Sequence, residues 1–281
     1  MKRLLLIGGR GQMGRTFGEV LARHFAVDVL DLDNAAEREA LLARADIVIV
    51  TVPLEIITEV IGALRGRLRP DALLADFASV KAPALAAMLA AHDGPVVGLH
   101  PMFGPGVKTL SGQAIVVCPG RTPAAAAALL EVFRAEGARL VECTASEHDH
   151  MMTVVQALRH FVTFSLGSFL AHEHVDVTRS LDFASPVYRL EIDMVSRLLA
   201  QDARLYVDIM LATPERRAMI QRLARHYSEL AALVGAGDRA GLLAKFDAAE
   251  AQFAQEAERA MQESNELIAI LAQRLQQSNR S

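Results

Sequence analysis

The stretch that decides the fold is Leu4-Leu5-Leu6-Ile7-Gly8-Gly9-Arg10-Gly11-Gln12-Met13-Gly14. A short apolar run leads directly into a Gly-x-Gly-x-x-Gly motif, and the residues from Met13 to His24 have a helical pattern. Strand, glycine turn and helix in this order are typical of dinucleotide-binding domains. The glycines let the backbone approach a pyrophosphate, and the helix N-terminus favours anions. The residues expected to contact the nucleotide are Gly9, Gly11, Gln12, Met13 and Gly14.

The end of the second apolar run indicates which dinucleotide binds. That run, Val27 to Leu30, is followed by Asp31, seventeen residues after Gly14. A carboxylate at this place accepts hydrogen bonds from the ribose hydroxyls and repels a 2′-phosphate, so Asp31 favours NAD over NADP. Arg10 and Arg15 leave some use of NADP open. The alternative is a glycine turn that binds another ligand or none.

Short apolar runs alternate with helical stretches throughout the first half of the chain. The runs are 4–7, 27–30, 47–52, 73–76, 96–99 and 115–117, and the helical stretches include 13–24, 83–91 and 124–136. Continuous apolarity suits strands that are buried on both faces, as in a parallel sheet covered by helices. We therefore predict an α/β fold for residues 1–145, a Rossmann-type doubly wound parallel sheet.

The second half of the chain has helical patterns without strands. We expect four helices. The first is capped by Ser146 and Glu147 and runs to about His172, and the second runs from Ser185-Pro186 to about Gln201. The third begins at Thr213-Pro214, and the fourth extends through 238–278. Residues 146–281 are thus predicted to form an all-α dimerisation domain. Its helices are rich in large apolar residues and need more partner surface than the domain supplies, so we expect a homodimer.

Composition limits the class of protein. The 281 residues are 52% hydrophobic, carry a net charge of −4 and include only two cysteines. These values indicate a globular chain of a reducing compartment without a nucleic-acid partner. The apolar run 4–7 is too short for a signal peptide, and no apolar run approaches the roughly 20 residues of a membrane span. We expect a cytoplasmic protein with no membrane partner.

A histidine follows another apolar run, in Leu99-His100-Pro101-Met102-Phe103-Gly104-Pro105. Parallel sheets present their functional groups at the carboxyl ends of the strands. A neutral imidazole there can take a proton while a bound nicotinamide takes a hydride. From spacing alone, a histidine held by loop contacts is the commoner interpretation. The histidines show no metal-ligand spacing, so we expect no metal.

Several motifs together resemble prephenate dehydrogenases, most closely the dehydrogenase half of the bifunctional chorismate mutase/prephenate dehydrogenases. Besides 99–105, they are Glu147-His148-Asp149, Gln156-Ala157-Leu158-Arg159-His160-Phe161 and Ser185-Pro186-Val187-Tyr188-Arg189-Leu190-Glu191. The resemblance extends from the glycine motif to Phe253. Since the chain begins at its first strand, without the mutase segment of the fused enzymes, we expect no mutase activity.

The resemblance implies an activity and a set of residue roles. The activity is NAD-dependent oxidative decarboxylation of prephenate to 4-hydroxyphenylpyruvate in tyrosine biosynthesis. His100 would accept the proton of the C4 hydroxyl, and Ser79 would hydrogen-bond the same hydroxyl and orient the histidine. Arg197 would hold the ring carboxylate and His160 would lie near the side-chain carboxylate. Gln156 and Arg189 would assist in substrate binding.

The same positions have plainer interpretations. A serine after a strand is most often a helix cap, and Arg197 has an ion-pair partner four residues earlier in Asp193. Asp149, Thr153, Gln156 and His160 recur at helical spacing, and such a polar stripe by default faces water. The resemblance instead directs it toward the substrate.

Two other functions stay open. One is an arogenate or dual-specificity cyclohexadienyl dehydrogenase, because no residue in the sequence decides between the keto and amino forms of the substrate. The other is a catalytically silent nucleotide-sensing protein, which the presence of Ser79, His100 and Arg197 disfavours.

Overall fold

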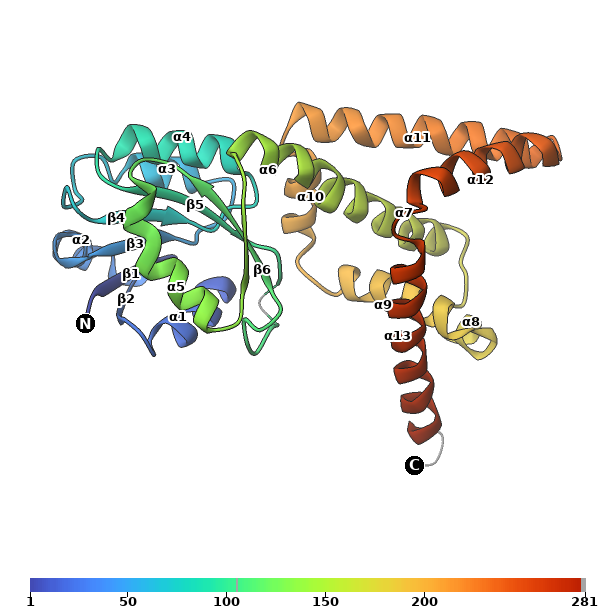
Figure 1. The fold of residues 1–281 in the computed structure, drawn as a ribbon, viewed down its shortest axis with the longest axis horizontal. Coiled ribbons are helices and arrows are strands. Elements are labelled where there is room, and N and C mark those ends of the chain that lie inside the picture. Colours follow the sequence, from blue (N-terminus) through green and yellow to red (C-terminus); the bar gives the residue numbers. More distant parts are fainter. Residues whose placement is uncertain (105, 279–281) are drawn as a thin grey trace. The chain divides into compact units, whose positions relative to one another are not determined.

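The computed structural model describes residues 1–104 and 106–278, and the chain divides into two compact units, residues 1–155 and 156–281. The predicted domain boundary between residues 145 and 146 lies ten residues earlier, at the start of a helix. Figure 1 shows the elements of both units.

The first unit alternates strands with helices, as the sequence predicts. Its strands are β1 (Arg3–Ile7), β2 (Ala26–Leu30), β3 (Ile47–Val50), β4 (Leu73–Asp76), β5 (Val96–Pro101), β6 (Ala114–Pro119) and β7 (Arg139–Glu142). Its helices are α1 (Gln12–Leu21), α2 (Arg38–Arg44), α3 (Ile57–Gly62), α4 (Lys81–Ala91), α5 (Ala127–Ala135) and α6 (Ala145–Met152), with 3₁₀ turns η1 (Leu32–Glu37) and η2 (Pro123–Ala126).

In the described residues the strands form one seven-stranded sheet in the order β2-β1-β3-β4-β5-β6-β7. β1 to β5 are parallel, which confirms the Rossmann-type α/β fold. β6 runs antiparallel to β5, and β7 is parallel to β6, so the sheet is mostly rather than wholly parallel. β7 was not among the predicted strands.

Helices cover both faces of this sheet, which explains the continuous apolar runs. Successive residues of β1 alternate between two cores: Leu5 and Ile7 pack with α2, α3 and α4, whereas Leu4 and Leu6 pack with α1 and α5. Strands β1 to β6 therefore contribute to both cores, and the sheet forms the base for the loops at its edge.

One phenylalanine of α1 connects these loops to the core. The ring of Phe17 is fully buried, with its centroid 4.3 Å from that of Phe77 and 5.8 Å from that of Phe103. Phe77 follows β4 and Phe103 follows β5. The loops that carry Ser79 and follow His100 are thus packed on the helix that begins at the glycine turn.

The second unit is helical. A π-helical turn, η3 (Thr153–Leu158), leads into α7 (Arg159–His172), and the remaining elements are α8 (Val177–Ser180), η4 (Leu181–Phe183), α9 (Pro186–Leu199), α10 (Ala203–Leu211), α11 (Pro214–Gly235), α12 (Arg239–Phe253) and α13 (Ala257–Ser278). No strand occurs among residues 156–278, as expected.

Three of the four predicted helix starts are confirmed, and one of them is Asp238, whose carboxylate caps α12 by accepting from the N–H of Gly241 (2.9 Å). The hydroxyls of Ser185 and Thr213 accept hydrogen bonds from backbone N–H groups three residues later. The first prediction was wrong, because Thr144, rather than Ser146 or Glu147, caps α6 by accepting from the N–H of Glu147 (3.1 Å). Threonine takes this place because its backbone is extended there, as an N-cap requires.

The helical run from Ala145 to His172 distributes its residues in an unusual way. Thr153 and His160 are buried, whereas Val154, Val155 and Val162 are 38–48% exposed. The polar stripe therefore does not face water in the manner of a surface helix. By length and composition this run is also apolar enough to cross a membrane, which corrects the expectation drawn from the sequence.

Candidate active site

The glycine turn between β1 and α1 has the geometry of an anion site. Gly8 has a φ of +78°, and a Cβ on Gly14 would lie 2.5 Å from the Cα of Gly9, so only glycine allows this approach of helix and turn. Gly11 is the N-cap of α1, and among the described residues no side chain caps this helix. Its first turn contains no acidic residue. The first amides of α1 are consequently available to an anionic ligand.

Asp31 stands directly after β2, beside this turn. Its Oδ2 accepts from the backbone N–H of Arg10 (3.1 Å), and its Oδ1 accepts from the N–H of Leu32 (2.9 Å). The guanidinium of Arg10 pairs with Asp33. Asp31 is thus held against the glycine turn, in the position from which a carboxylate meets an adenosine ribose.

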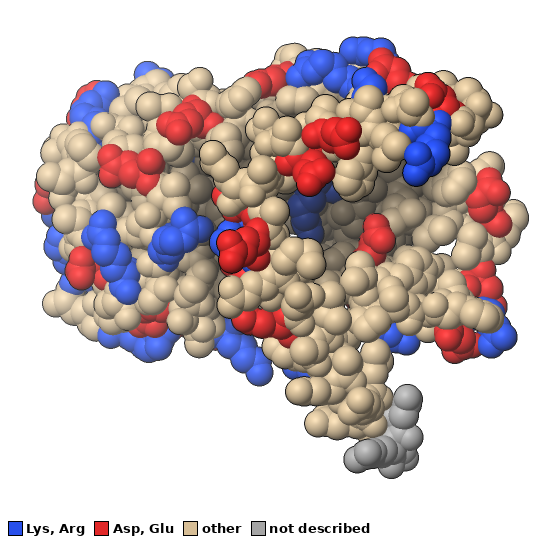
Figure 2. All heavy atoms as spheres, turned by 45° about the vertical axis from the view of Figure 1, so that its right-hand side comes forward, with Lys and Arg blue, Asp and Glu red and all other residues tan. Residues whose placement is uncertain are grey.

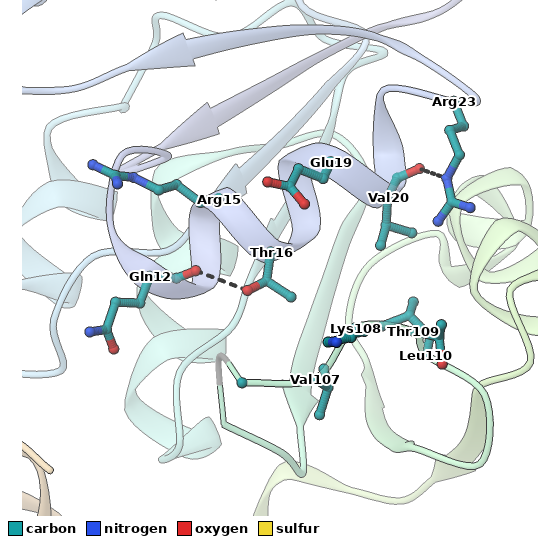
Figure 3. Close-up of a pocket in the computed structure, with 11 residues that line it drawn as sticks. Gln12, Arg15, Thr16, Glu19, Val20, Arg23, Val107, Lys108, Thr109 and Leu110 are labelled. Carbon is teal, nitrogen blue, oxygen red and sulfur yellow. Dashed lines mark hydrogen bonds between the residues drawn. The ribbon is translucent and has the colours of Figure 1, made fainter. Parts of the chain in front are cut away.

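A cavity of about 760 Å³ lies between α1 and the segment 106–110. Figure 3 shows its lining, with Gln12, Arg15 and Thr16 on α1 and Lys108 opposite. The lining includes neither His100 nor Asp31, so this cavity extends beside the glycine turn and does not contain the candidate catalytic group.

His100 lies on β5 and is only 4% exposed. Its Nδ1 is 2.8 Å from Nε2 of His148 on α6, and Nδ1 of His148 is 2.7 Å from Oδ1 of Asp149. The same carboxylate accepts from the backbone N–H groups of Lys81 (2.6 Å) and Ala82 (2.8 Å), at the start of α4. A continuous chain of hydrogen-bonding groups thus connects the N-terminus of α4 to the imidazole of His100.

A buried ion pair lies behind this chain. The ammonium of Lys81 pairs with Asp76 at the end of β4 and donates to the carbonyl oxygen of Leu99 (2.8 Å), and both charged side chains are fully buried. Asp76 also accepts from the N–H of Ala78 (2.8 Å). These contacts connect the β4–α4 loop to the residue before His100. Ser79, half-buried in that loop, is therefore carried on a segment held against β5.

Pro105, the last residue of the histidine motif, lies outside the described residues. The rest of the motif is placed by β5 and by the stacking of Phe103 on Phe17.

In the second unit, His160 of α7 lies in cationic surroundings. It is 8% exposed, and its ring packs edge-on against Tyr206 with centroids 4.8 Å apart. Burial lowers its pKa to about 4, and the charges of Arg159 and Arg216 act in the same direction. His160 is accordingly neutral at pH 7.

Arg216 is the largest fully buried side chain in the described residues. Its guanidinium donates to the carbonyl oxygen of Ile209 (2.8 Å). Burial raises the pKa of Tyr206, and the positive charges of Arg159 and Arg197 oppose that rise. The sequence reasoning did not identify Arg159, Tyr206 or Arg216. These three residues, which with His160 form a helical cluster, lie on the separate helices α7, α10 and α11. No local sequence motif indicates that they belong together.

The remaining predicted substrate residues lie on helices of this unit. Arg189 and Arg197 are on α9, which packs against α7, and Gln156 lies in the π-helical turn before α7. Arg197 is exposed, and in the described part of the chain no ion pair joins it to Asp193. His160 thus packs against Tyr206, the charge of Arg197 acts on the pKa of the same tyrosine, and the surface ion pair with Asp193 is not formed.

A mostly parallel sheet with a glycine turn at its first helix, and a buried histidine at the end of β5, define a dinucleotide-binding oxidoreductase. Comparison with known proteins narrows the class. Residues 21–142 match the family model "Prephenate dehydrogenase, nucleotide-binding domain", and residues 144–248 match "Prephenate dehydrogenase, dimerization domain". The chain belongs to the prephenate dehydrogenase family.

Relatives support this membership over nearly the whole chain. The T-protein of Enterobacter agglomerans is 43% identical over 269 residues, which are 95% of this chain and 72% of that protein. The T-protein of Haemophilus influenzae is 40% identical over 95% of this chain and 71% of its own length. The structure of prephenate dehydrogenase from Aquifex aeolicus with hydroxyphenyl propionate and NAD⁺ has the same fold. Its TM-score is 0.71 at 20% identity, over 90% of this chain and 97% of that one.

Proposed function

We propose that this protein is an NAD-dependent prephenate dehydrogenase of tyrosine biosynthesis. Prephenate and NAD⁺ would give 4-hydroxyphenylpyruvate, CO₂ and NADH, with no net release of a proton. The observation that carries the proposal is the buried His100 at the end of β5, in a chain of this family whose glycine turn fits a dinucleotide. A catalytically silent nucleotide sensor would have no need to bury and orient such an imidazole.

The residues that would hold the cofactor are those of the glycine turn and the end of β2. The uncapped amides of α1 suit a pyrophosphate, with Gly9, Gly11, Gln12, Met13 and Gly14 in contact with it. Asp31 would accept hydrogen bonds from the ribose hydroxyls. NAD, when bound, supplies the acceptor for the hydride from C4 of prephenate.

His100 would accept the proton of the C4 hydroxyl as the C4–H bond is broken. The resulting ketone draws electrons from the bond to the ring carboxylate, CO₂ leaves and the ring becomes aromatic. The imidazolium then returns its proton to the same oxygen, so that no proton is released in the overall reaction. A positioned general base of this kind contributes roughly 10²–10⁴-fold to rate. Ser79 would hydrogen-bond the same hydroxyl.

The two carboxylates of prephenate require cationic partners. We assign Arg197 to the ring carboxylate and the surroundings of His160 to the side-chain carboxylate, with Gln156 and Arg189 assisting. Support comes from the charges of Arg159, Arg197 and Arg216 around the helical cluster. Planar guanidinium groups suit such paired contacts with carboxylates.

We further propose that residues 146–281 mediate a homodimer, and that 1–145 form the nucleotide-binding domain. The exposed apolar side chains of the second unit support the dimer; they include Phe164, Phe169, Val187, Leu199, Leu205 and Leu211. A second copy of the chain is a better partner than lipid for the exposed apolar side chains of 145–172, because this run also carries the polar side chains of His148, Asp149 and His160. Figure 2 shows acidic and basic side chains interspersed on the face in view, which suits a cytoplasmic protein without a nucleic-acid partner.

The test is NADH formation by the purified protein with prephenate or arogenate at matched concentrations. Turnover of prephenate alone is the expected result. Equal turnover of arogenate would make the protein a dual-specificity cyclohexadienyl dehydrogenase, and turnover of neither would contradict the proposal. His100→Asn is expected to abolish turnover while NAD⁺ affinity, measured by calorimetry, stays unchanged.

A further inference from the structure

We propose that His148 and Asp149 are positioning residues, which fix the tautomer of His100 so that its Nε2 carries the basic lone pair. The inference rests on the proposed function, in which His100 is the general base. It concerns a question that the assignment of the base leaves open, namely which of the two ring nitrogens receives the proton.

The argument begins at Asp149, whose protonation state is fixed by its contacts. Although burial acts against ionisation, hydrogen bonds from His148 and from the N–H groups of Lys81 and Ala82 lower the pKa of Asp149. The carboxylate also lies at the positive end of α4, a helix of eleven residues. Asp149 is therefore ionised near neutral pH and can only accept hydrogen bonds.

The contact at 2.7 Å then determines the tautomer of His148. Because Asp149 can only accept, Nδ1 of His148 must carry its proton. In the neutral imidazole the other nitrogen, Nε2, has a lone pair and accepts. The approach of His100 Nδ1 to this lone pair at 2.8 Å requires that Nδ1 of His100 carries a proton and donates it. The basic lone pair of neutral His100 is consequently on Nε2.

Burial and orientation support this assignment. His148 is 1% exposed and His100 is 4% exposed, so water does not substitute for either partner. The two rings meet at 72° with centroids 5.0 Å apart, which is the edge-on arrangement expected when an N–H points at a lone pair in a neighbouring ring plane. No proton has to move along the chain during the reaction. Its role is to hold one tautomer and to stabilise the imidazolium that forms, as a buried carboxylate does for the histidine of serine proteases.

A spectroscopic measurement tests the tautomer without any turnover. In the intact protein labelled with ¹⁵N-histidine and saturated with NAD⁺, long-range ¹H–¹⁵N spectra distinguish protonated from unprotonated ring nitrogens. The His100 signals are identified by their loss in His100→Asn. We expect Nδ1 protonated and Nε2 unprotonated. The reverse pattern would overturn the proposal even if prephenate is turned over, so its failure is distinct from failure of the proposed function.

Variants of His148 test the consequence for catalysis. His148→Phe removes the acceptor, so both tautomers of His100 become populated and we expect kcat to fall on the order of 10²-fold. KM for prephenate and the Kd of NAD⁺ should not change. His148→Gln can present an amide oxygen near the position of Nε2 and should recover most of kcat.

The matched control is His150→Phe, which makes the same exchange at an exposed position of α6. It should leave kcat unchanged. If His148→Phe retains normal kcat, or if His148→Gln is as impaired as His148→Phe, the positioning role is wrong. A variant that fails to fold does not remove the test, since the spectrum of the unmodified protein decides the tautomer.

Discussion

Replacing Lys81 by methionine is expected to destabilise the first unit by about 3–5 kcal/mol, because it leaves a buried carboxylate without its partner. Both Lys81 and Asp76 have fully buried side chains. The change also removes the hydrogen bond from the ammonium group to the carbonyl oxygen of Leu99. Methionine keeps most of the apolar stem, so loss of packing contributes little and the effect reports mainly on the charge.

The size of the effect should depend on pH in a defined direction. Burial raises the pKa of Asp76, and in the unmodified protein Lys81 opposes that rise. Without Lys81, the pKa of Asp76 in the folded protein lies further above its value in the unfolded chain. A group whose pKa is higher in the folded protein than in the unfolded chain stabilises the folded state when the pH is below the pKa of the unfolded chain. That stabilisation is lost as the pH rises through the pKa of the folded protein. The deficit of Lys81→Met should therefore grow as pH increases.

Urea unfolding followed by far-ultraviolet circular dichroism provides the assay, because the chain contains no tryptophan. Measurements at about pH 5 and about pH 8 bracket the expected change. The double variant Asp76→Asn/Lys81→Met removes both charges but keeps an acceptor for the N–H of Ala78, and it should recover most of the lost stability. A deficit below about 1 kcal/mol at both pH values, or no recovery in the double variant, would refute the reasoning.

Four further changes have defined outcomes. Gly14→Ala places a methyl group 2.5 Å from the Cα of Gly9, and should abolish NAD⁺ binding in calorimetry and cost about 1–3 kcal/mol in urea unfolding. Gly18→Ala on the same helix meets its nearest atom at 3.5 Å and should gain about 0.5–1 kcal/mol, so equal behaviour of the two variants would contradict the close approach at the turn. Arg197→Ala should raise KM for prephenate by the equivalent of about 2–5 kcal/mol, whereas an unchanged KM would mean that the ring carboxylate is held elsewhere. The depressed pKa of His160, about 4 against 6.5, should make stability fall as pH decreases from 6.5 toward 4, and thermal unfolding of His160→Gln at about pH 7 and about pH 5 should show a smaller decrease.

Most of the first unit could be predicted because its strands are buried on both faces. Runs such as 47–50 are entirely apolar, and a glycine turn follows the first of them. β7 escaped prediction because it is a four-residue strand with exposed ends and only two half-buried positions. The direction of β6 could not be predicted either, because a short apolar run looks the same in the sequence whether the strand pairs in parallel or antiparallel.

The residues of the candidate site also differ in whether the sequence alone reveals them. His100 and the glycine turn are recognisable because each occupies a fixed position in a local motif. The partner of His100 is 48 residues away, on a helix whose contact with β5 only the folded chain reveals. Arg216 is harder still, since a buried arginine has the same appearance in sequence as the exposed Arg217 beside it.

The π-helical turn at Thr153–Leu158 carries a consequence for how this chain can change over evolution. Such a turn amounts to one residue inserted into an α-helix, and its hydrogen bonding is weaker than that of the regular helix. Deleting one residue there would restore regular geometry and locally favour the helix. It would also turn the residues that follow the deletion by about 100° around the helix axis. A chain shortened by one residue at this turn would therefore gain a more regular helix, but the side chains of α7 would point in a different direction around its axis.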